Sequence, residues 1–261
     1  MIKLACVGDN CVDFYDETQE IFFGGNPVNV AVYAKRLGAD SSYIGAVGND
    51  SFGAEMLKAI SAKGVDTSHT RILPGATALT HVSRVDGDRV FGDYDEGVMA
   101  DFRMSDKDID FICSHDIMVS GLWGHTASEL DRLNAKVPIA FDFSDRPDGP
   151  EAEAALPYTD IAFFSDDDSE TEALKKKMSD LAERGPETVV ATRGAKGSLA
   201  LSAGRFYEQE ALLCELVDTM GAGDSFIAAF LIAFVRGEDI ALCMKAGAES
   251  AAFTISYPGA W

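Results

Sequence analysis

The stretch Asp218-Thr219-Met220-Gly221-Ala222-Gly223-Asp224-Ser225 places a carboxylate among glycines at the start of a strongly apolar segment. Residues 226–235 are all apolar and Gly237 follows them, which predicts a buried helix that begins at the glycines. Residues 212–217, just upstream, are rich in apolar side chains and indicate a strand. The first amides of a helix lack intrahelical partners and attract phosphate oxygens. The pattern therefore predicts a phosphate-binding turn between a strand and a helix.

Asp224 needs its own explanation, because a carboxylate repels a bound anion. One hypothesis is that Asp224 is the general base of a phosphoryl-transfer reaction. The alternative is that Asp224 or Ser225 caps the helix while the glycines form a turn. The stretch has neither the Gly-x-x-x-x-Gly-Lys-Ser/Thr pattern nor the Gly-x-Gly-x-x-Gly pattern. The stretch alone leaves both interpretations open.

The composition is typical of one large folded unit. The chain has 261 residues, of which 47% are hydrophobic and 25% are charged, so we expect a single domain over residues 1–261. The longest apolar run is 226–235, too short for a bilayer, and residues 1–7 resemble a strand rather than a signal peptide. A cytoplasmic protein without a membrane partner is expected. The net charge of −21 argues against nucleic acid, and five cysteines without a Cys-x-x-Cys pair predict reduced thiols.

Strand-like and helix-like segments alternate along the chain, which predicts a mainly parallel sheet covered by helices. The strands are expected at 4–7, 42–47, 117–120, 139–143, 161–164 and 188–192, and helices at 27–37, 53–63 and 170–184. Ligands of such sheets bind at the carboxyl ends of the strands. Residues 11–23 and 67–98 break the alternation, and Asp86-Gly87-Asp88 is a hairpin signal. These two segments predict a small extra sheet that serves as a lid or a dimer contact.

Polar residues follow the first strand and open the first helix. Asn26 is suited to cap that helix and Pro27 to its first position, which the stretch 24–29 alone favours; the alternative is that this stretch brings the backbone close to a polyol. Asp9 and Asp13 would stand at the ligand edge of the sheet, where they either bind vicinal hydroxyls or form Asx turns.

Two further stretches also allow two interpretations. Residues 192–197 form either a tight hairpin turn or a nucleotide-phosphate contact made by Thr192, Gly194 and Gly197. His125 follows the expected 117–122 strand and either faces a ligand or bonds a loop carbonyl, since the four histidines lack the spacing of a metal site.

Taken in order, four elements resemble the ribokinase-like PfkB family of carbohydrate kinases: Asp13, Gly24-Gly25-Asn26-x-x-Asn29, Thr192-x-Gly194-x-x-Gly197 and Asp218-Thr219-x-Gly221-Ala222-Gly223-Asp224. The resemblance covers essentially the whole chain. It implies a ribokinase-like three-layer α/β/α fold with a small β-sheet lid, and ATP with Mg²⁺ as cofactors. The stretches 89–102, 123–125, 141–145 and 259–261 are similar to those of the family's fructoselysine kinases. This similarity implies phosphorylation of the 6-hydroxyl of fructoselysine, a sugar–amino-acid conjugate.

The resemblance also implies a role for each matched position. Asp224 would be the general base, and the amides of Gly221, Ala222 and Gly223 would surround the transferring phosphoryl group. The expected sugar-binding residues are Asp9, Asp13, Gly25, Asn26 and Asn29. The residues expected along the nucleotide are Thr192, Gly194, Gly197, Thr219, Gly221, Gly223 and Gly247. A K⁺ ion near the Asp218–Thr219 backbone is a further implied cofactor.

The chain departs from the family pattern after the 161–164 strand. Many members carry Asn-x-x-Glu there to organise Mg²⁺, whereas this chain has Ser165-Asp166-Asp167-Asp168-Ser169-Glu170, so Asp168 or a neighbour would take that role. The lysine portion of the implied substrate needs charged partners, and the residues we expect to meet it are Arg89, Asp93, Tyr94 and Glu96. His125 is expected among the substrate-binding residues without a more specific role. The alternative is a solvated hairpin face. Competing functions are a kinase for fructose or fructose-asparagine and a catalytically silent sugar-binding protein, and a homodimer through the lid is expected.

Overall fold

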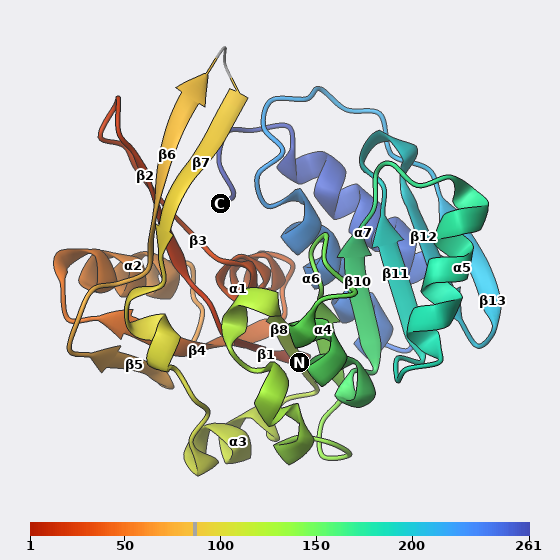
Figure 1. The fold of residues 1–261 in the computed structure, drawn as a ribbon, viewed down its shortest axis with the longest axis horizontal. Coiled ribbons are helices and arrows are strands. Elements are labelled where there is room, and N and C mark those ends of the chain that lie inside the picture. Colours follow the sequence, from red (N-terminus) through yellow and green to blue (C-terminus); the bar gives the residue numbers. More distant parts are fainter. Residues whose placement is uncertain (86–87) are drawn as a thin grey trace.

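A nine-stranded sheet forms the centre of the molecule, and a second, four-stranded sheet projects beside it (Figure 1). The structure is a computed structural model that describes residues 1–85 and 88–261, with the side chains at 84, 85 and 88–91 left aside. The large sheet contains, in spatial order, β13 (Arg205–Gln209), β12 (Ser198–Ser202), β11 (Thr188–Thr192), β10 (Ile161–Ser165), β9 (Ile139–Asp142), β8 (Ile117–Gly121), β1 (Lys3–Val7), β4 (Asp40–Gly48) and β5 (Thr70–Leu73).

The predicted mainly parallel sheet is confirmed. All neighbouring pairs from β11 to β5 are parallel, and only β12 and β13 run antiparallel to their neighbours. Strands such as β1 and β10 are buried along nearly their whole length, as expected for strands covered on both faces.

Helices cover both faces of the large sheet and create two apolar cores. One core includes side chains of α1 (Asn26–Arg36), α2 (Ser51–Ala62), α6 (Ala222–Val235) and α7 (Ile240–Thr254). The other includes side chains of α3 (Asp106–Ile112), α4 (Pro150–Ala155) and α5 (Thr171–Ala182). Short 3₁₀ helices are η1 (Gly97–Asp101), η2 (Leu122–Gly124), η3 (Ala127–Arg132), η4 (Leu156–Tyr158) and η5 (Gly194–Lys196). The three-layer α/β/α architecture is therefore confirmed.

The small sheet has the order β3 (Ile21–Gly24), β2 (Cys11–Tyr15), β6 (Leu79–Val85) and β7 (Asp88–Asp95). It joins both segments that broke the alternation, since β2 pairs with β3 antiparallel and with β6 parallel. The expected segment 67–98 began too early, because β5 pairs with β4 in the large sheet. Asp86 and Gly87 of the expected hairpin turn lie outside the described residues.

Helix α6 begins at the glycine turn, as predicted, and residues 225–233 of it are buried. The strand expected at 212–217 is wrong: this segment has no regular structure, and Leu213 and Leu216 are 104% and 65% exposed. An apolar run predicts a strand only where a neighbour pairs with it, and the antiparallel partner of β12 is β13 instead.

Parallel strands end at one edge of the sheet, and this edge collects the polar residues of interest. Asp9 follows β1, His125 follows β8, and Asp142 closes β9. Asp168 follows β10 and Thr192 closes β11. None of the helices within the described ranges is long and apolar enough to cross a membrane.

Candidate active site

Asp224 lies in the first turn of α6 and is held by two asparagines of α1. Asn26 Nδ2 donates to Asp224 Oδ1 at 2.7 Å, and Asn29 Nδ2 donates to Asp224 Oδ2 at 2.7 Å. Both asparagines fall in the first turn of a helix that packs against α6. The two helix starts therefore bring together three of the residues that the sequence predicted for the site.

Two more carboxylates adjoin this pair of asparagines. Asn26 Nδ2 also donates to Asp142 Oδ2 at 2.9 Å, and the Asn26 backbone N–H donates to Asp9 Oδ2 at 3.2 Å. We call Asp9, Asn26, Asn29, Asp142 and Asp224 the carboxylate cluster. Sequence reasoning missed Asp142 as a site residue, although its position at the end of β9 was the available signal.

The three carboxylates of the carboxylate cluster all have raised pKa values. Burial is the main cause that raises the pKa of Asp224 to about 6, against the lowering effect of the Asn29 and Asn26 amides. Burial likewise raises the pKa of Asp9 to about 6 and that of Asp142 to about 7, with repulsion between carboxylates as a smaller contribution. A carboxylate with a pKa near 6 is ionised at neutral pH and still able to accept a proton, as a general base requires.

The expectation that Asn26 caps α1 is wrong. The cap position is Gly25, which has a φ of 105° and makes no side-chain cap, and Asn26 is the first helical residue. A side chain at residue 25 would meet Asn10 Cα at 2.6 Å, so only glycine allows the turn. The Asn26 amide is thereby free to reach the carboxylates across the sheet edge.

The two glycines of the turn before Asp224 lie in different surroundings. Gly221 is the cap residue of α6 with a φ of 74°, and a Cβ there would lie 2.4 Å from the Tyr33 hydroxyl oxygen. A Cβ at Gly223 would meet open space among the described residues. The Ala222 amide donates to the Thr219 carbonyl at 3.2 Å, so it is already engaged. The start of α6 is thus open at Gly223, where the helix dipole favours an anion.

The residues expected along the nucleotide lie in three places, of which the glycine turn with Thr219, Gly221 and Gly223 is the first. Thr192 pairs with Ser198 across the β11–β12 turn, where Gly194 and Gly197 have φ values of 51° and 84°. Gly247 is buried in α7, where a Cβ would overlap the Phe226 ring at 2.7 Å. Close packing of α7 on α6 therefore explains glycine at 247.

Three consecutive aspartates follow β10. Asp166 accepts from Lys177 Nζ at 3.2 Å and from the Ser169 amide, while Asp168 is exposed. Asp167 borders the η5 turn, because a Cβ at Gly194 would lie 3.2 Å from its Oδ2. The described residues contain no cluster of three side chains that could by itself hold a metal ion.

A second group of side chains surrounds the end of β8. His125 Nε2 lies 3.2 Å from Glu96 Oε2, and the Tyr94 ring packs edge-on against Trp123 with centroids 6.4 Å apart. The Arg146 guanidinium lies 5.1 Å from the centre of the Trp123 ring. We call Tyr94, Glu96, Trp123, His125 and Arg146 the rim. Burial is the main cause that raises the pKa of Tyr94, and the negative charge of Asp9 adds to it.

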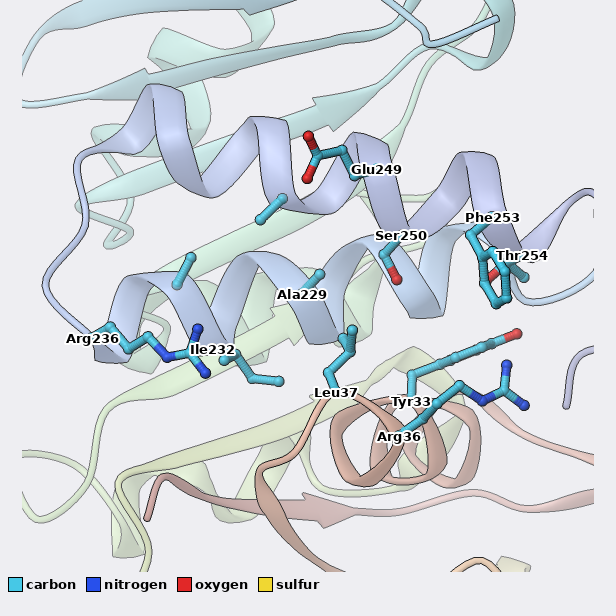
Figure 2. A pocket seen from close by; sticks show the side chains of 12 residues that line it. Tyr33, Arg36, Leu37, Ala229, Ile232, Arg236, Glu249, Ser250, Phe253 and Thr254 are labelled. Carbon is cyan, nitrogen blue, oxygen red and sulfur yellow. The ribbon is translucent and has the colours of Figure 1, made fainter. Parts of the chain in front are cut away.

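The remaining predicted residues are less closely tied to Asp224. Asp13 lies in β2 of the small sheet, opposite Phe22 of β3. Arg89 lies in β7, and its side chain falls outside the described part of the chain. A pocket of about 370 Å³ between α1, α6 and α7 includes Tyr33, Arg36, Ile232 and Phe253 in its lining but no member of the carboxylate cluster (Figure 2).

Comparison with known proteins shows the family of the chain. The model of the pfkB family of carbohydrate kinases matches residues 1–261. The chain belongs to the pfkB family of carbohydrate kinases. Fructoselysine 6-kinases from Shigella flexneri and Escherichia coli are 44% and 43% identical to it, in alignments that span the full length of each chain. A fructosamine kinase from Bacillus subtilis is 36% identical over all of this chain and 93% of its own length.

Solved structures of other kinases share the fold. A ribokinase from Arabidopsis thaliana, solved with ribose and ATP, superposes with a TM-score of 0.91. That alignment covers 99% of this chain and 93% of the ribokinase at 21% identity, so it shows the shared fold. Because the alignment covers nearly the whole chain, the shared fold includes the three layers and the small sheet.

Proposed function

We propose that this protein is a cytoplasmic ATP-dependent kinase that phosphorylates the 6-hydroxyl of fructoselysine. The observation that carries the proposal is Asp224, an ionisable carboxylate at the start of α6 that two asparagine amides hold in place. The full-length similarity to fructoselysine 6-kinases supports the choice of substrate.

In the proposed reaction Asp224 accepts the proton of the sugar hydroxyl as that oxygen attacks the γ-phosphorus of ATP. The open helix start at Gly223 lies one residue away and would face the transferring group. Phosphoryl transfer depends mainly on alignment and on stabilisation of charge, so a prearranged base and amide group suit it. Because Asp224 must be ionised, activity should decline as the pH falls through about 6.

The sugar would occupy the carboxylate cluster. Asp9 Oδ1 and Asn26 Oδ1 are buried acceptors without a partner among the described residues. Buried acceptors of this kind are satisfied by donors from a ligand, and sugar hydroxyls are such donors. Gly25, Asn29 and Asp13 complete the sugar-binding set that we propose.

The cations would be held mainly through ATP. Mg²⁺ keeps several waters and binds phosphate oxygens together with one or two carboxylates, which fits a chain without a ready-made ligand cluster among its described residues. Asp168, or Asp167 beside Gly194, is the carboxylate we propose to act through water. For K⁺ the proposed place is the Asp218–Thr219 backbone, where both oxygens of Asp218 accept backbone amides.

The lysine portion of fructoselysine would contact the rim. Its ammonium group suits Glu96, its carboxylate suits Arg146, and the aliphatic chain suits the faces of Tyr94 and Trp123. Arg89 and Asp93 on β7 are further candidates from the sequence. We also propose a homodimer through the small sheet, whose edge strands are β3 and β7; a single monomeric mass in sedimentation at all concentrations would refute it.

A panel of acceptors tests the proposal. ADP formation is measured with fructoselysine, fructose-asparagine and fructose, each with and without Mg²⁺. We expect the highest kcat/KM with fructoselysine and no turnover without Mg²⁺. Preference for fructose, as in the 30% identical fructokinase of Salmonella typhimurium, would instead identify a general sugar kinase. Absence of turnover with every acceptor would favour a silent binding protein.

A further inference from the structure

The segment 259–261 lies against the start of both α1 and α6, although it is far from them in sequence. The Gly259 amide donates to Asp218 Oδ2 at 2.9 Å, and the Tyr33 hydroxyl donates to the Ala260 carbonyl. Ala260 is 4% exposed, and Figure 1 shows the chain ending close to the small sheet. The two residues before Trp261 are therefore held in place by Asp218 and Tyr33.

Trp261 continues this set of bonds towards the base. Its indole Nε1–H donates to Asn29 Oδ1 at 2.7 Å, and Asn29 Nδ2 donates in turn to Asp224 Oδ2 at 2.7 Å. An indole N–H can only donate, and an ionised carboxylate can only accept. The Asn29 amide between them satisfies both neighbours in one orientation only.

We propose that Trp261 is a positioning residue for Asp224, acting through the Asn29 amide. Its indole fixes the amide so that the NH₂ group faces the carboxylate. Without that donor the amide can rotate and present its oxygen to Asp224, which repels the ionised base. The proposal rests on Asp224 as the base of the proposed reaction.

The other asparagine provides an internal contrast. Asn26 Nδ2 donates to two carboxylates, and no donor fixes its Oδ1 among the described residues. Asn26 is thus oriented by its acceptors, whereas Asn29 is oriented from both ends. Removal of the indole should loosen one of the two bonds to Asp224 and leave the other.

The charge around Asp224 makes this change measurable. The titratable groups that face it are Asp9, Asp142 and Tyr33, all of which oppose its ionisation or remain neutral. The two asparagine amides are the groups that favour the ionised form. Loss of the Asn29 donor therefore raises the pKa of Asp224.

The unaltered protein provides the first test, because it contains only two tryptophans. In ¹⁵N-labelled protein the Trp261 indole signal, assigned with a Trp123→Phe variant, should shift with a midpoint near pH 6. Asp224→Asn should abolish that shift, and Asp142→Asn, which keeps the Asn29–Asp224 bond, should retain it. An indole signal that does not titrate, or that titrates equally in Asp224→Asn, would overturn the proposal.

The variant Trp261→Phe removes the N–H and keeps an aromatic ring. The carboxyl ¹³C titration of Asp224 should move upward by about half a pH unit or more. The matched control Lys63→Ala removes the ammonium 5.4 Å from the Trp261 ring but keeps the N–H, so its midpoint should be unchanged. A folded Trp261→Phe with the original midpoint contradicts the proposal; if it does not fold, the indole titration decides.

Neither titration uses a sugar substrate. A wrong substrate would therefore leave both results intact, whereas a wrong positioning role would fail them even if fructoselysine is phosphorylated. Where turnover is measured, Trp261→Phe should lower kcat several-fold and shift its acidic limb upward, with the KM for ATP unchanged.

Discussion

The carboxylate cluster and the segment 210–217 that leads into the same glycine turn are built in opposite ways. In the cluster, Asp224 has two amide donors and Asn29 is bonded at both ends. The segment 210–217 has no regular structure, and Leu212, Leu213, Leu216 and Val217 are 40–104% exposed. The proposed base is thus arranged before a substrate arrives, and such preorganised charge would favour catalysis. The segment 210–217, on the other side of the turn, contributes little to the stability of the fold.

The two glycines of the turn should show the largest difference. Gly221→Ala introduces a Cβ at a φ of 74° and 2.4 Å from the Tyr33 hydroxyl, so unfolding free energy should fall by about 2–4 kcal/mol. Gly223→Ala enters open space in a helix and should not destabilise the protein, but should lower kcat because its methyl group lies where the phosphoryl group would be. Chemical denaturation and kinetics separate the two. Equal destabilisation would contradict this account of the turn.

Asp142→Asn tests how much the buried Asp142 carboxylate lowers the stability of the folded protein at neutral pH. The folded-state pKa of Asp142 is raised to about 7 from an ordinary 3.8, so the folded protein holds a proton that the unfolded chain releases between these values. Stability is therefore lost as the pH rises from about 4 to 7. The variant removes this loss, and its stability relative to the parent should rise by on the order of 3 kcal/mol between pH 4.5 and 8. A difference that is constant with pH would show that Asp142 titrates normally.

The sequence predicted much of the fold and part of the candidate site, because local patterns determine these features. The parallel sheet, the glycine turn before an apolar helix and the grouping of polar residues at the strand ends all follow from periodicity and turn chemistry. The wrong strand at 212–217 shows the limit, since pairing depends on which neighbour is available. Asp142 and Trp261 were missed as site residues. The end of β9 was a local signal for the position of Asp142, but its bond to Asn26 spans 116 residues and the bond of Trp261 to Asn29 spans 232 residues. No local pattern encodes such distances.

The rim should govern the choice of substrate. Arg146→Ala should raise the KM for fructoselysine roughly tenfold, equivalent to about 1.4 kcal/mol, and leave turnover of fructose unchanged. Arg205→Ala is the matched control, because Arg205 also stacks on an aromatic ring, Tyr207, but on the edge strand β13. Steady-state kinetics with both acceptors provides the measurement. Equal loss on fructose and fructoselysine would remove the rim from lysine recognition.

The smallest effect is expected in the segment 210–217. Leu213 is fully exposed, so Leu213→Ser should change the unfolding free energy by less than about 0.5 kcal/mol. Thermal denaturation would detect any larger change in the unfolding free energy. A larger loss would mean that the segment packs on the protein and that its contrast with the carboxylate cluster is overstated.

Asp224→Asn is the sharpest test of the proposal that Asp224 is the base of a sugar kinase. The substitution keeps the size of the side chain and removes its ability to accept the hydroxyl proton. Turnover of fructoselysine should fall by about 10²–10⁴-fold while calorimetry gives an unchanged Kd for ATP. Turnover within tenfold of the parent, with the same acidic limb near pH 6, would contradict the account.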